Sequence, residues 1–233
     1  MIVGQTYMYE NFMTDFNFGT LAPQRHSVLS SCPDQIFGHM KGKTYIPRSI
    51  AERENILYKE CPTEISPLRC PIVVVLESPH KSEFSGTKPL GIAHGKTGAL
   101  FNTNFGALFS RTDIFQDIKT DDIHDVVLVN AVQYQCSLGL PLNKYENKLK
   151  RDELWLSCFE RQCASDLCDR LAALEPFSVI NLCTKGVKNL QLVLHEKLCN
   201  FPNYMYGTHP STWNFDYAYI QHPLKECSNE KIL

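Results

Sequence analysis

The sequence has 233 residues, 43% of them hydrophobic, which suits one α/β domain with a large core. Its 23 lysines and arginines nearly balance its 25 acidic residues, so any nucleic-acid binding must come from a local basic stripe. No window resembles a signal peptide or a membrane span, and the ten cysteines show no disulfide-like spacing. We therefore expect a cytoplasmic protein with reduced cysteines.

The first 69 residues are predicted to be an N-terminal extension packed on a main domain of residues 70–233. Residues 1–47 mix aromatic residues with glycine, proline and polar residues, and they are too apolar to be disordered. Arg48–Glu60 has the composition of a helix, which Pro62 would end.

Four short apolar runs in the main domain predict strands of a parallel sheet, because each is bounded by polar or turn residues and too short for a confident helix. They are Pro71–Leu76, Asp125–Asn130, Phe177–Cys183 and Tyr204–Thr208. Helical spacing of apolar residues predicts helices between them, over Gly98–Phe109, Glu153–Leu174 and a segment from Val187 to Leu198. The alternation indicates an α/β fold with right-handed crossovers.

Polar residues follow each predicted strand. They are Glu77, Asn130, Thr184-Lys185 and His209. The carboxyl ends of parallel strands meet at one edge of the sheet, where ligands bind in open α/β folds. An acid, an amide, a cation and an imidazole on one rim predict a functional site there. A solvated glutamate at the start of a loop is the alternative for Glu77, and a strand-end turn former is the alternative for Asn130.

The order of these motifs resembles the uracil-DNA glycosylase superfamily over most of residues 70–215. LESPH is similar to GQDPYH and GEAPG, and PLGIAHGKTGALF is similar to RPFVGRAGxLL. VLVNAV is similar to LLNxxL, VINLCTKGVKNL to VIVALGATAAQAL, and THPSTW contains the HPS motif. The resemblance implies a three-layer α/β/α sandwich with a central, mostly parallel four-stranded sheet.

The resemblance also implies roles for the rim residues in excising a base from DNA. Glu77 would orient water and stabilise a sugar cation, and His209 would bind the base carbonyl as negative charge develops on it. Asn130 would read the base edge with its paired donor and acceptor. Ser78, His80, Ala93 and His94 would complete the substrate pocket. Lys96, Lys185 and Ser211 would contact DNA, with Trp213 either a wedge in the vacated base stack or a packing residue.

Departures from the family pattern bear on the substrate. Ala93 and His94 stand where relatives carry the aromatic residue that stacks on uracil, so the pocket gains space and loses stacking energy. This resembles superfamily members that defend bacteria by removing glucosylated hydroxymethylcytosine from phage DNA. One feature argues against a modified base. His80 stands where archetypal enzymes place the tyrosine that excludes 5-substituents. We expect a modified pyrimidine, with uracil as the alternative.

One branch of the superfamily carries a four-cysteine iron–sulfur cluster. Cys136 and Cys158 stand near two of its ligand positions, but the N-terminal Cys-x-x-Cys is absent. We therefore expect neither a metal nor an organic cofactor, and a monomer that acts on double-stranded DNA. The other readings left open are a non-catalytic binder of modified DNA and an enzyme that processes free nucleotides or nucleosides.

Overall fold

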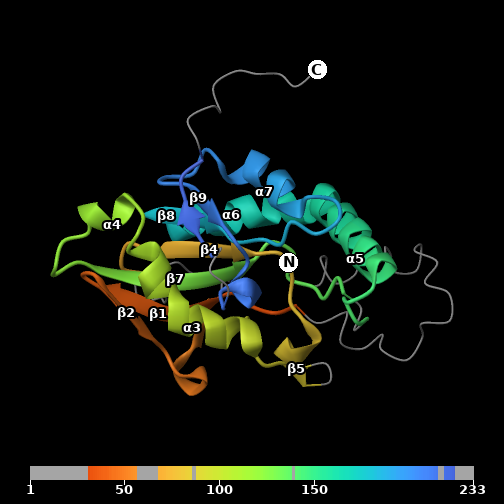
Figure 1. The fold of residues 1–233 in the computed structure, drawn as a ribbon, viewed down its shortest axis with the longest axis horizontal. Coiled ribbons are helices and arrows are strands. Elements are labelled where there is room, and N and C mark those ends of the chain that lie inside the picture. The colour runs from red at the N-terminus through yellow and green to blue at the C-terminus, as the bar shows by residue number, and fades with distance from the viewer. Residues whose placement is uncertain (1–30, 57–67, 86–87, 138–139, 215–217, 224–233) are drawn as a thin grey trace.

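The protein is described here from a computed structural model, which covers residues 31–56, 68–85, 88–137, 140–214 and 218–223 (Figure 1). The four predicted strands are confirmed. They are β4 Ile72–Leu76, β7 Ile123–Asn130, β8 Ser178–Asn181 and β9 Met205–Gly207. β4 pairs in parallel with β7 and with β8, and β8 pairs in parallel with β9, so the order is β7-β4-β8-β9.

The sheet is larger and more mixed than predicted, because antiparallel strands extend it at both edges. Their bounds are β1 Gln35–Lys41, β2 Thr44–Pro47, β3 Glu54–Asn55 and β10 Ile220–Gln221. β1 pairs with β7, β2 and β3 pair with β1, and β10 pairs with β9. Most of the added strands are short and largely exposed, so they lack the apolar runs that identify buried strands.

Helices pack against both faces of the sheet. Their bounds are α3 Lys96–Phe109, α4 Ile114–Asp117, α5 Tyr145–Cys158, α6 Ala164–Leu174 and α7 Leu190–Leu198. Side chains alternate along β4, so Val73 and Val75 belong to the core under α5, α6 and α7. Ile72 and Val74 belong to the core that contains the aromatic residues of α3. Burial of β4 on both faces explains its unbroken apolar sequence.

Two helix predictions need correction. The predicted helix over Glu153–Leu174 begins earlier, at Tyr145, and a π-helical segment at Phe159–Cys163 separates α5 from α6. Within the described part of Arg48–Glu60, the predicted helix is wrong. A 3₁₀ helix at Ile50–Glu52 and strand β3 occupy that part, and residues 57–60 lie outside the described residues. Pairing of β3 with β1 overrides the local helix propensity.

Residues before position 69 contribute to the same sheet and core. Phe37 and Met40 of β1 are fully buried beside Ile72 of β4. Asp34, also fully buried, forms an ion pair with Arg170 of α6. The described part of the predicted extension is therefore joined to the main domain by backbone pairing and by an internal ion pair.

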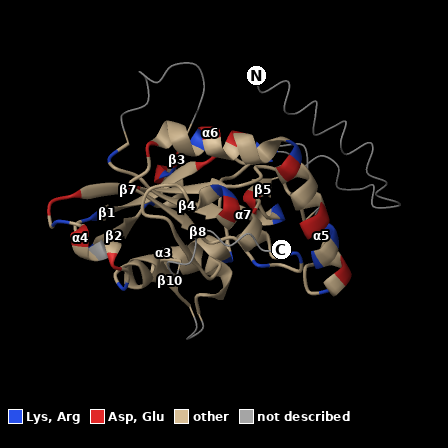
Figure 2. Ribbon diagram, turned by 90° about the horizontal axis from the view of Figure 1, so that it is seen from above, with Lys and Arg blue, Asp and Glu red and all other residues tan. Residues whose placement is uncertain are grey.

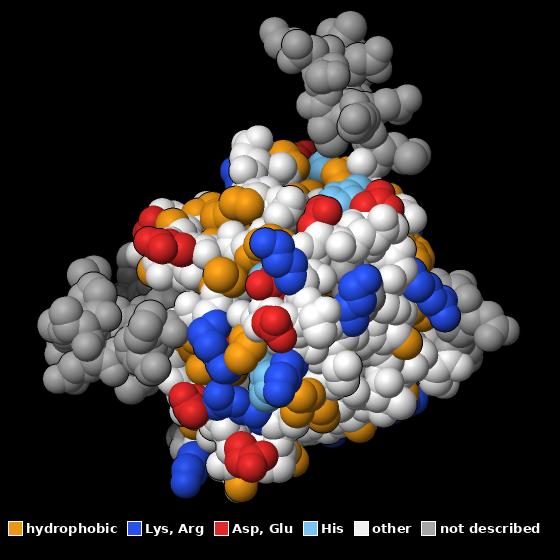
Figure 3. Space-filling model, turned by 90° about the vertical axis from the view of Figure 1, so that its left-hand side faces the viewer, with side chains coloured by type: hydrophobic (Ala, Val, Ile, Leu, Met, Phe, Trp, Pro, Cys, Tyr) orange, Lys and Arg blue, Asp and Glu red, His pale blue; other side chains and the backbone are white. Residues whose placement is uncertain are grey.

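Charged side chains of both signs are spread over the surface. Figure 2 shows acidic and basic residues interspersed along α5. The end of the molecule on the side of α4 is also mixed (Figure 3). Ion pairs join Arg69 with Asp125 and Arg48 with Glu54. No helix in the described parts of the chain combines the length and apolarity needed to cross a bilayer.

Candidate functional site

A cavity of about 820 Å³ opens at the carboxyl edge of the parallel strands. It brings together seven of the predicted site residues. These are Glu77, Ser78, His80, Ala93, Lys96, His209 and Ser211. Thr184, from the end of β8, lines the same cavity. In Figure 1, α5 and β5 (Phe84–Ser85), which follow β7 and β4, lie at this end of the sheet.

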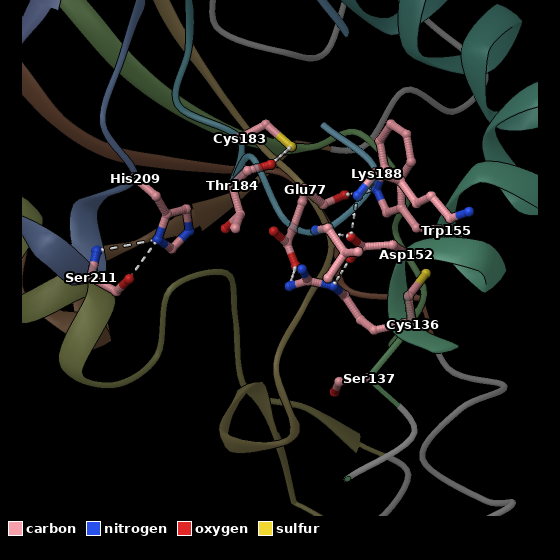
Figure 4. Close-up of polar contacts among 12 residues, drawn as sticks. Glu77, Cys136, Ser137, Asp152, Trp155, Cys183, Thr184, Lys188, His209 and Ser211 are labelled. Atoms are coloured by element: carbon pink, nitrogen blue, oxygen red, sulfur yellow. Dashed lines mark hydrogen bonds and ion pairs between the residues drawn. The ribbon is translucent and has the colours of Figure 1, made fainter. Parts of the chain in front are cut away.

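Glu77 lies deep in this cavity, directly after β4, between His209 on one side and Asp152 and Trp155 on the other (Figure 4). Its Oε1 atom accepts a hydrogen bond from Nη1 of Arg151 at 2.6 Å. The Trp155 indole donates to the Glu77 carbonyl oxygen at 2.7 Å. The second carboxylate oxygen, Oε2, is buried and has no hydrogen-bond partner of normal geometry among the described residues. Arg151 therefore fixes Oε1, and the hydroxyl of Thr184 lies close enough to the carboxyl group to lower its pKa.

Burial raises the pKa of Glu77 above its ordinary value, and the charge of Arg151 and the hydroxyl of Thr184 oppose this effect. Glu77 in turn raises the pKa of Arg151, although burial acts in the opposite direction. Burial outweighs these effects and the net pKa is raised, while the ion pair with Arg151 limits the rise.

The sequence prediction missed Arg151 and Asp152, both buried on α5. Nε of Arg151 donates to Oδ1 of Asp152 at 2.5 Å. Oδ2 of Asp152 accepts the backbone N–H groups of Val187 and Lys188 at 2.5 and 3.0 Å. This chain of contacts connects the loop after β8 through α5 to Glu77.

These two residues do not stand out from their neighbours in the sequence, because Tyr145–Asp152 is rich in charge and resembles a solvated loop or helix face. Trp155 was also overlooked, although it is fully buried and stacks on Phe159 with ring centroids 4.5 Å apart. The sequence gives one hint that this part of the helix is buried. Trp155 comes one turn after Arg151 and Asp152, so all three residues lie on one side of a helix.

His209 follows β9 and lines the cavity on the side away from α5. Its Nδ1 atom accepts from the backbone N–H of Ser211 at 3.2 Å and lies 2.8 Å from the Ser211 hydroxyl oxygen. Burial, and then the charge of Arg151, lowers the pKa of His209 to about 4. The imidazole is therefore neutral at pH 7.

Asn130 lies at the end of β7 and is almost fully buried, but it does not line the cavity. Its backbone N–H donates to Asp34, and its carbonyl oxygen accepts from Arg170 at 3.0 Å. Its side chain acts on the carboxyl group of Glu83, whose pKa it lowers. Asn130 therefore lies behind the residues that line the cavity, and it is these lining residues that a substrate would contact.

Glu83 is a second buried acid on the cavity that the sequence prediction missed. Burial raises its pKa to about 8, against the opposing effect of the backbone N–H groups of His80 and Ala93. Its neighbour Cys32 lies 3.9 Å from Oε2. At pH 7 this carboxyl group is mostly protonated and supplies little negative charge to the cavity.

The predicted pocket residues differ in position. Ser78 is half-buried and His80 is exposed at the cavity rim. Ala93 is buried with a positive φ of 50°, and a Cβ atom on Gly98 would lie 2.0 Å from its carbonyl oxygen. Gly98 therefore allows α3 to approach this loop. His94 does not line the cavity, and its buried Nδ1 has no hydrogen-bond partner among the described residues.

The residues predicted to contact DNA do not all lie on the cavity. Lys96 and Ser211 line the cavity, whereas Lys185 is exposed outside it. Trp213 is 3% exposed and stacks on Phe101 with ring centroids 5.5 Å apart. Its indole donates to the carbonyl oxygen of Thr208 at 2.8 Å. Trp213 is therefore a packing residue, and the wedge interpretation needs a surface position that this side chain does not have.

Cys136 and Cys158 are buried neighbours, and burial raises the pKa of Cys136, with Cys158 adding to the effect. Within the described ranges, no group of three or more His, Cys, Asp or Glu side chains is arranged to hold a metal ion. The described residues thus do not supply the four thiolates that such a cluster needs.

Comparisons with known proteins add no relative. A scan against protein-family models finds no match, and searches of curated proteins and of solved structures find none either. The functional proposal therefore rests on the geometry of the cavity.

Proposed function

We propose that the protein is a monofunctional DNA glycosylase that flips a modified pyrimidine out of duplex DNA and hydrolyses its N-glycosidic bond, leaving an abasic site. The single observation that carries this proposal is the state of Glu77. It is a buried carboxyl group beside the Thr184 hydroxyl, with Oε1 held by Arg151 and Oε2 lacking a hydrogen bond of normal geometry to any described residue, on the same cavity as a neutral imidazole. A carboxylate held in this way suits the stabilisation of a cation and the orientation of water.

The charges around Glu77 support the same chemistry. Two carboxylates, Glu77 and Asp152, share one guanidinium, that of Arg151. With Glu77 ionised, as the proposed reaction requires, the group has an excess of one negative charge in a buried setting, where electrostatic interactions are strong. A positively charged sugar ring would be stabilised beside it.

In the proposed reaction, the bond between the base nitrogen and C1′ breaks and its electron pair leaves with the base. Nε2–H of His209 donates a hydrogen bond to the base oxygen on which that charge develops. Glu77 orients a water molecule, whose oxygen forms the new bond to C1′. The water proton passes to the carboxylate of Glu77 and then to the departing base or solvent, so the enzyme ends unchanged.

The proposed fold is the three-layer α/β/α sandwich of uracil-DNA glycosylases. The strand order β7-β4-β8-β9 supports it, with α3 on one face and α5, α6 and α7 on the other. The added antiparallel strands are extensions of that centre. A modified base is favoured over uracil because Ala93 lines a roomy cavity where an aromatic ring would fill space.

The experiment is a base-release assay. Duplexes that contain uracil or glucosylated hydroxymethylcytosine are incubated with the protein, and abasic sites are then cleaved with alkali. We expect release of the modified base and a loss of at least about 100-fold in Glu77→Gln, because the neutral amide cannot stabilise a cation. Exposed Glu146→Gln is the matched control and should retain full activity.

Release of neither base would refute the substrate proposal, and retained activity in Glu77→Gln would refute the role of Glu77. One observation favours a second candidate, a non-catalytic binder of modified DNA. The ion pair with Arg151 offsets part of the Glu77 charge that catalysis needs. Tight binding of the modified duplex without base release would identify this binder.

A further inference from the structure

Two segments on the cavity share one local structure, His80-Lys81-Ser82 and His209-Pro210-Ser211. Each histidine precedes a 3₁₀ helix, with φ and ψ of −90° and 158° at His80 and −63° and 138° at His209. In each, Nδ1 accepts from the serine backbone N–H two residues later, at 3.3 and 3.2 Å. The serine hydroxyl oxygens lie 3.0 and 2.8 Å from the same nitrogens.

This arrangement fixes the proton on each ring. A backbone N–H group can only donate, so Nδ1 must present its lone pair and the neutral imidazole carries its hydrogen on Nε2. Burial lowers the pKa of both histidines, assisted by the charge of Lys81 at His80 and of Arg151 at His209. Both Nε2–H groups are therefore donors without a formal charge.

Neither Nε2 atom forms a hydrogen bond with another described residue, and both rings line the same cavity. Their surroundings differ. His209 lies near Arg151 and Glu77, where the proposed chemistry takes place. His80 is exposed at the rim, and Ser82, Gly95 and Lys96 line the cavity with it.

The rim around His80 is suited to an anionic oxygen. Lys81 and Lys96 supply positive charge, and the nearby Glu83 carboxyl is mostly neutral at pH 7. Gly95 allows the loop before α3 to lie close to the His80-Lys81-Ser82 segment, since a Cβ atom at Gly95 would lie 3.3 Å from the Ser82 hydroxyl oxygen. The half-buried donor of His209, beside Glu77, can serve a base oxygen, whereas the exposed donor of His80 among lysines suits a phosphate oxygen.

We propose that His80 donates its Nε2–H to a phosphate oxygen of the DNA backbone at the mouth of the cavity, as the outer counterpart of His209. The inference deepens the proposed function and rests on it. It assigns substrate positioning to His80 and leaves the bond-breaking step to Glu77 and His209.

Three variants test the role of His80. His80→Ala removes both the Nε2 donor and the helix cap. His80→Asn keeps a side-chain oxygen that can accept the Ser82 N–H but does not carry a donor to the Nε2 position. We expect both variants to raise KM about 10-fold and leave kcat within a factor of two, because a hydrogen bond to a charged oxygen is lost. Lys96→Ala is the charge control.

The salt dependence of binding to a duplex with a non-cleavable sugar analogue separates a neutral donor from a cation. The slope of log K against log salt should be unchanged in both His80 variants and smaller by about one in Lys96→Ala. Wild-type affinity in His80→Asn would show that His80 only caps the 3₁₀ helix and would overturn the proposal. A kcat loss with unchanged KM would overturn it as well.

Nitrogen NMR of the histidine side chains tests the inference without any turnover. In the free protein we expect the Nε2–H tautomer for both rings at pH 7, and a shift of the His80 Nε2 signal when duplex DNA binds. A shift with a nucleoside 5′-monophosphate but not with DNA would overturn the assignment to backbone phosphate. DNA binding that needs His80, without release of any base, would refute the proposed catalysis and leave this inference standing.

Discussion

Arg151 is the residue on which the electrostatics of the candidate site depend. Its guanidinium contacts both Glu77 and Asp152, and its charge lowers the pKa of His209. Because breaking a buried ion pair leaves an uncompensated charge, the pair is sensitive to loss of either partner. Burial is the main cause of both pKa shifts, and Arg151 modifies the pKa of both residues that the proposed reaction uses.

We predict that Arg151→Met moves the acidic limb of the pH–rate profile to higher pH. Arg151 opposes the effect of burial on Glu77, so its removal raises the pKa of Glu77 further. The ionised fraction at pH 7 falls, and the rate falls with it by about 10-fold or more. We also expect a stability loss of roughly 3–5 kcal/mol.

The measurement is the pH dependence of kcat/KM with the substrate found in the base-release assay. Arg161→Met, on the π-helical segment, provides a control for loss of one positive charge. An acidic limb in Arg151→Met at the wild-type position would contradict the proposed coupling between Arg151 and Glu77.

At this scale the sequence identified residues that stand directly at strand ends. Glu77 and His209 were found because each interrupts an apolar run, and the strand order brings both to one cavity. Arg151 and Glu83 could not be found in the same way. A charge buried by tertiary contacts has the same local sequence as a charge exposed to water.

At the scale of elements, the loop between β8 and α7 is tied to α5 through Asp152. Val187 and Lys188 donate their N–H groups to Oδ2 of Asp152. Gly186, with φ of 63°, lies where a Cβ atom would be 2.4 Å from that oxygen and 2.9 Å from Nη2 of Arg151. The loop can approach α5 only because residue 186 lacks a side chain.

We predict that Gly186→Ala destabilises the protein by about 1–3 kcal/mol, because the new methyl group meets Asp152 and the positive φ becomes strained. Activity should fall more than stability explains, since displacement of Asp152 also displaces Arg151. Urea unfolding and the base-release assay, at a temperature where both proteins are folded, measure the two effects.

Lys185→Ala, a change at the exposed neighbouring position, is the control for Gly186→Ala. It should leave stability within about 0.5 kcal/mol of wild type. Equal activity in Gly186→Ala and wild type would show that the position of Arg151 does not depend on this loop.

The π-helical segment at Phe159–Cys163 explains why the helix boundaries were difficult to predict. It lies between two helices whose apolar residues follow ordinary helical spacing, so the pattern from Leu156 to Leu174 indicates one continuous helix. The earlier part, Tyr145–Asp152, carries mostly polar residues, a composition that is also typical of a loop. Within it, the burial of Arg151 and Asp152 depends on contacts with Glu77 and with the loop after β8, which local sequence does not encode.

For the whole molecule, the buried carboxyl group of Glu83 links stability to pH. Its pKa in the folded protein is about 8, above the ordinary value of 4.5. Below pH 4.5 the group is neutral in both folded and unfolded chains. Between pH 4.5 and 8 only the unfolded chain loses the proton, so the free energy of unfolding decreases as pH rises.

We predict that Glu83→Gln removes this contribution. Relative to the variant, wild type should lose on the order of 5 kcal/mol of stability between pH 4.5 and 8, with no further loss from this group at higher pH. Urea unfolding at pH 5, 7 and 8.5 measures the difference. Exposed Glu146→Gln corrects for removal of one acidic residue. Parallel stability–pH curves for wild type and Glu83→Gln would refute the assignment.

The centre of the fold was predictable because its buried strands are short apolar runs that are easily recognised in the sequence, as in Ile72–Leu76. The edges were not, since β2 and β10 have few residues and little burial. The role of the N-terminal residues was also not predictable. Phe37 and Met40 reach the core only through pairing of β1 with β7, a contact between segments far apart in the chain.

Asp34 has a consequence for synthesis of the protein. It is fully buried, and its two carboxylate oxygens contact groups 96 and 136 residues later in the chain, Asn130 and Arg170. At about 5–20 residues per second, a ribosome needs roughly 7–27 s to add the intervening 136 residues. Strand β1 has no β7 to pair with until Asn130, 96 residues after Asp34, has been added, and its apolar face stays exposed until then. Asp34 and β1 therefore dock only after later parts of the chain have been made, and this is the period in which a chaperone would be most useful to the nascent chain.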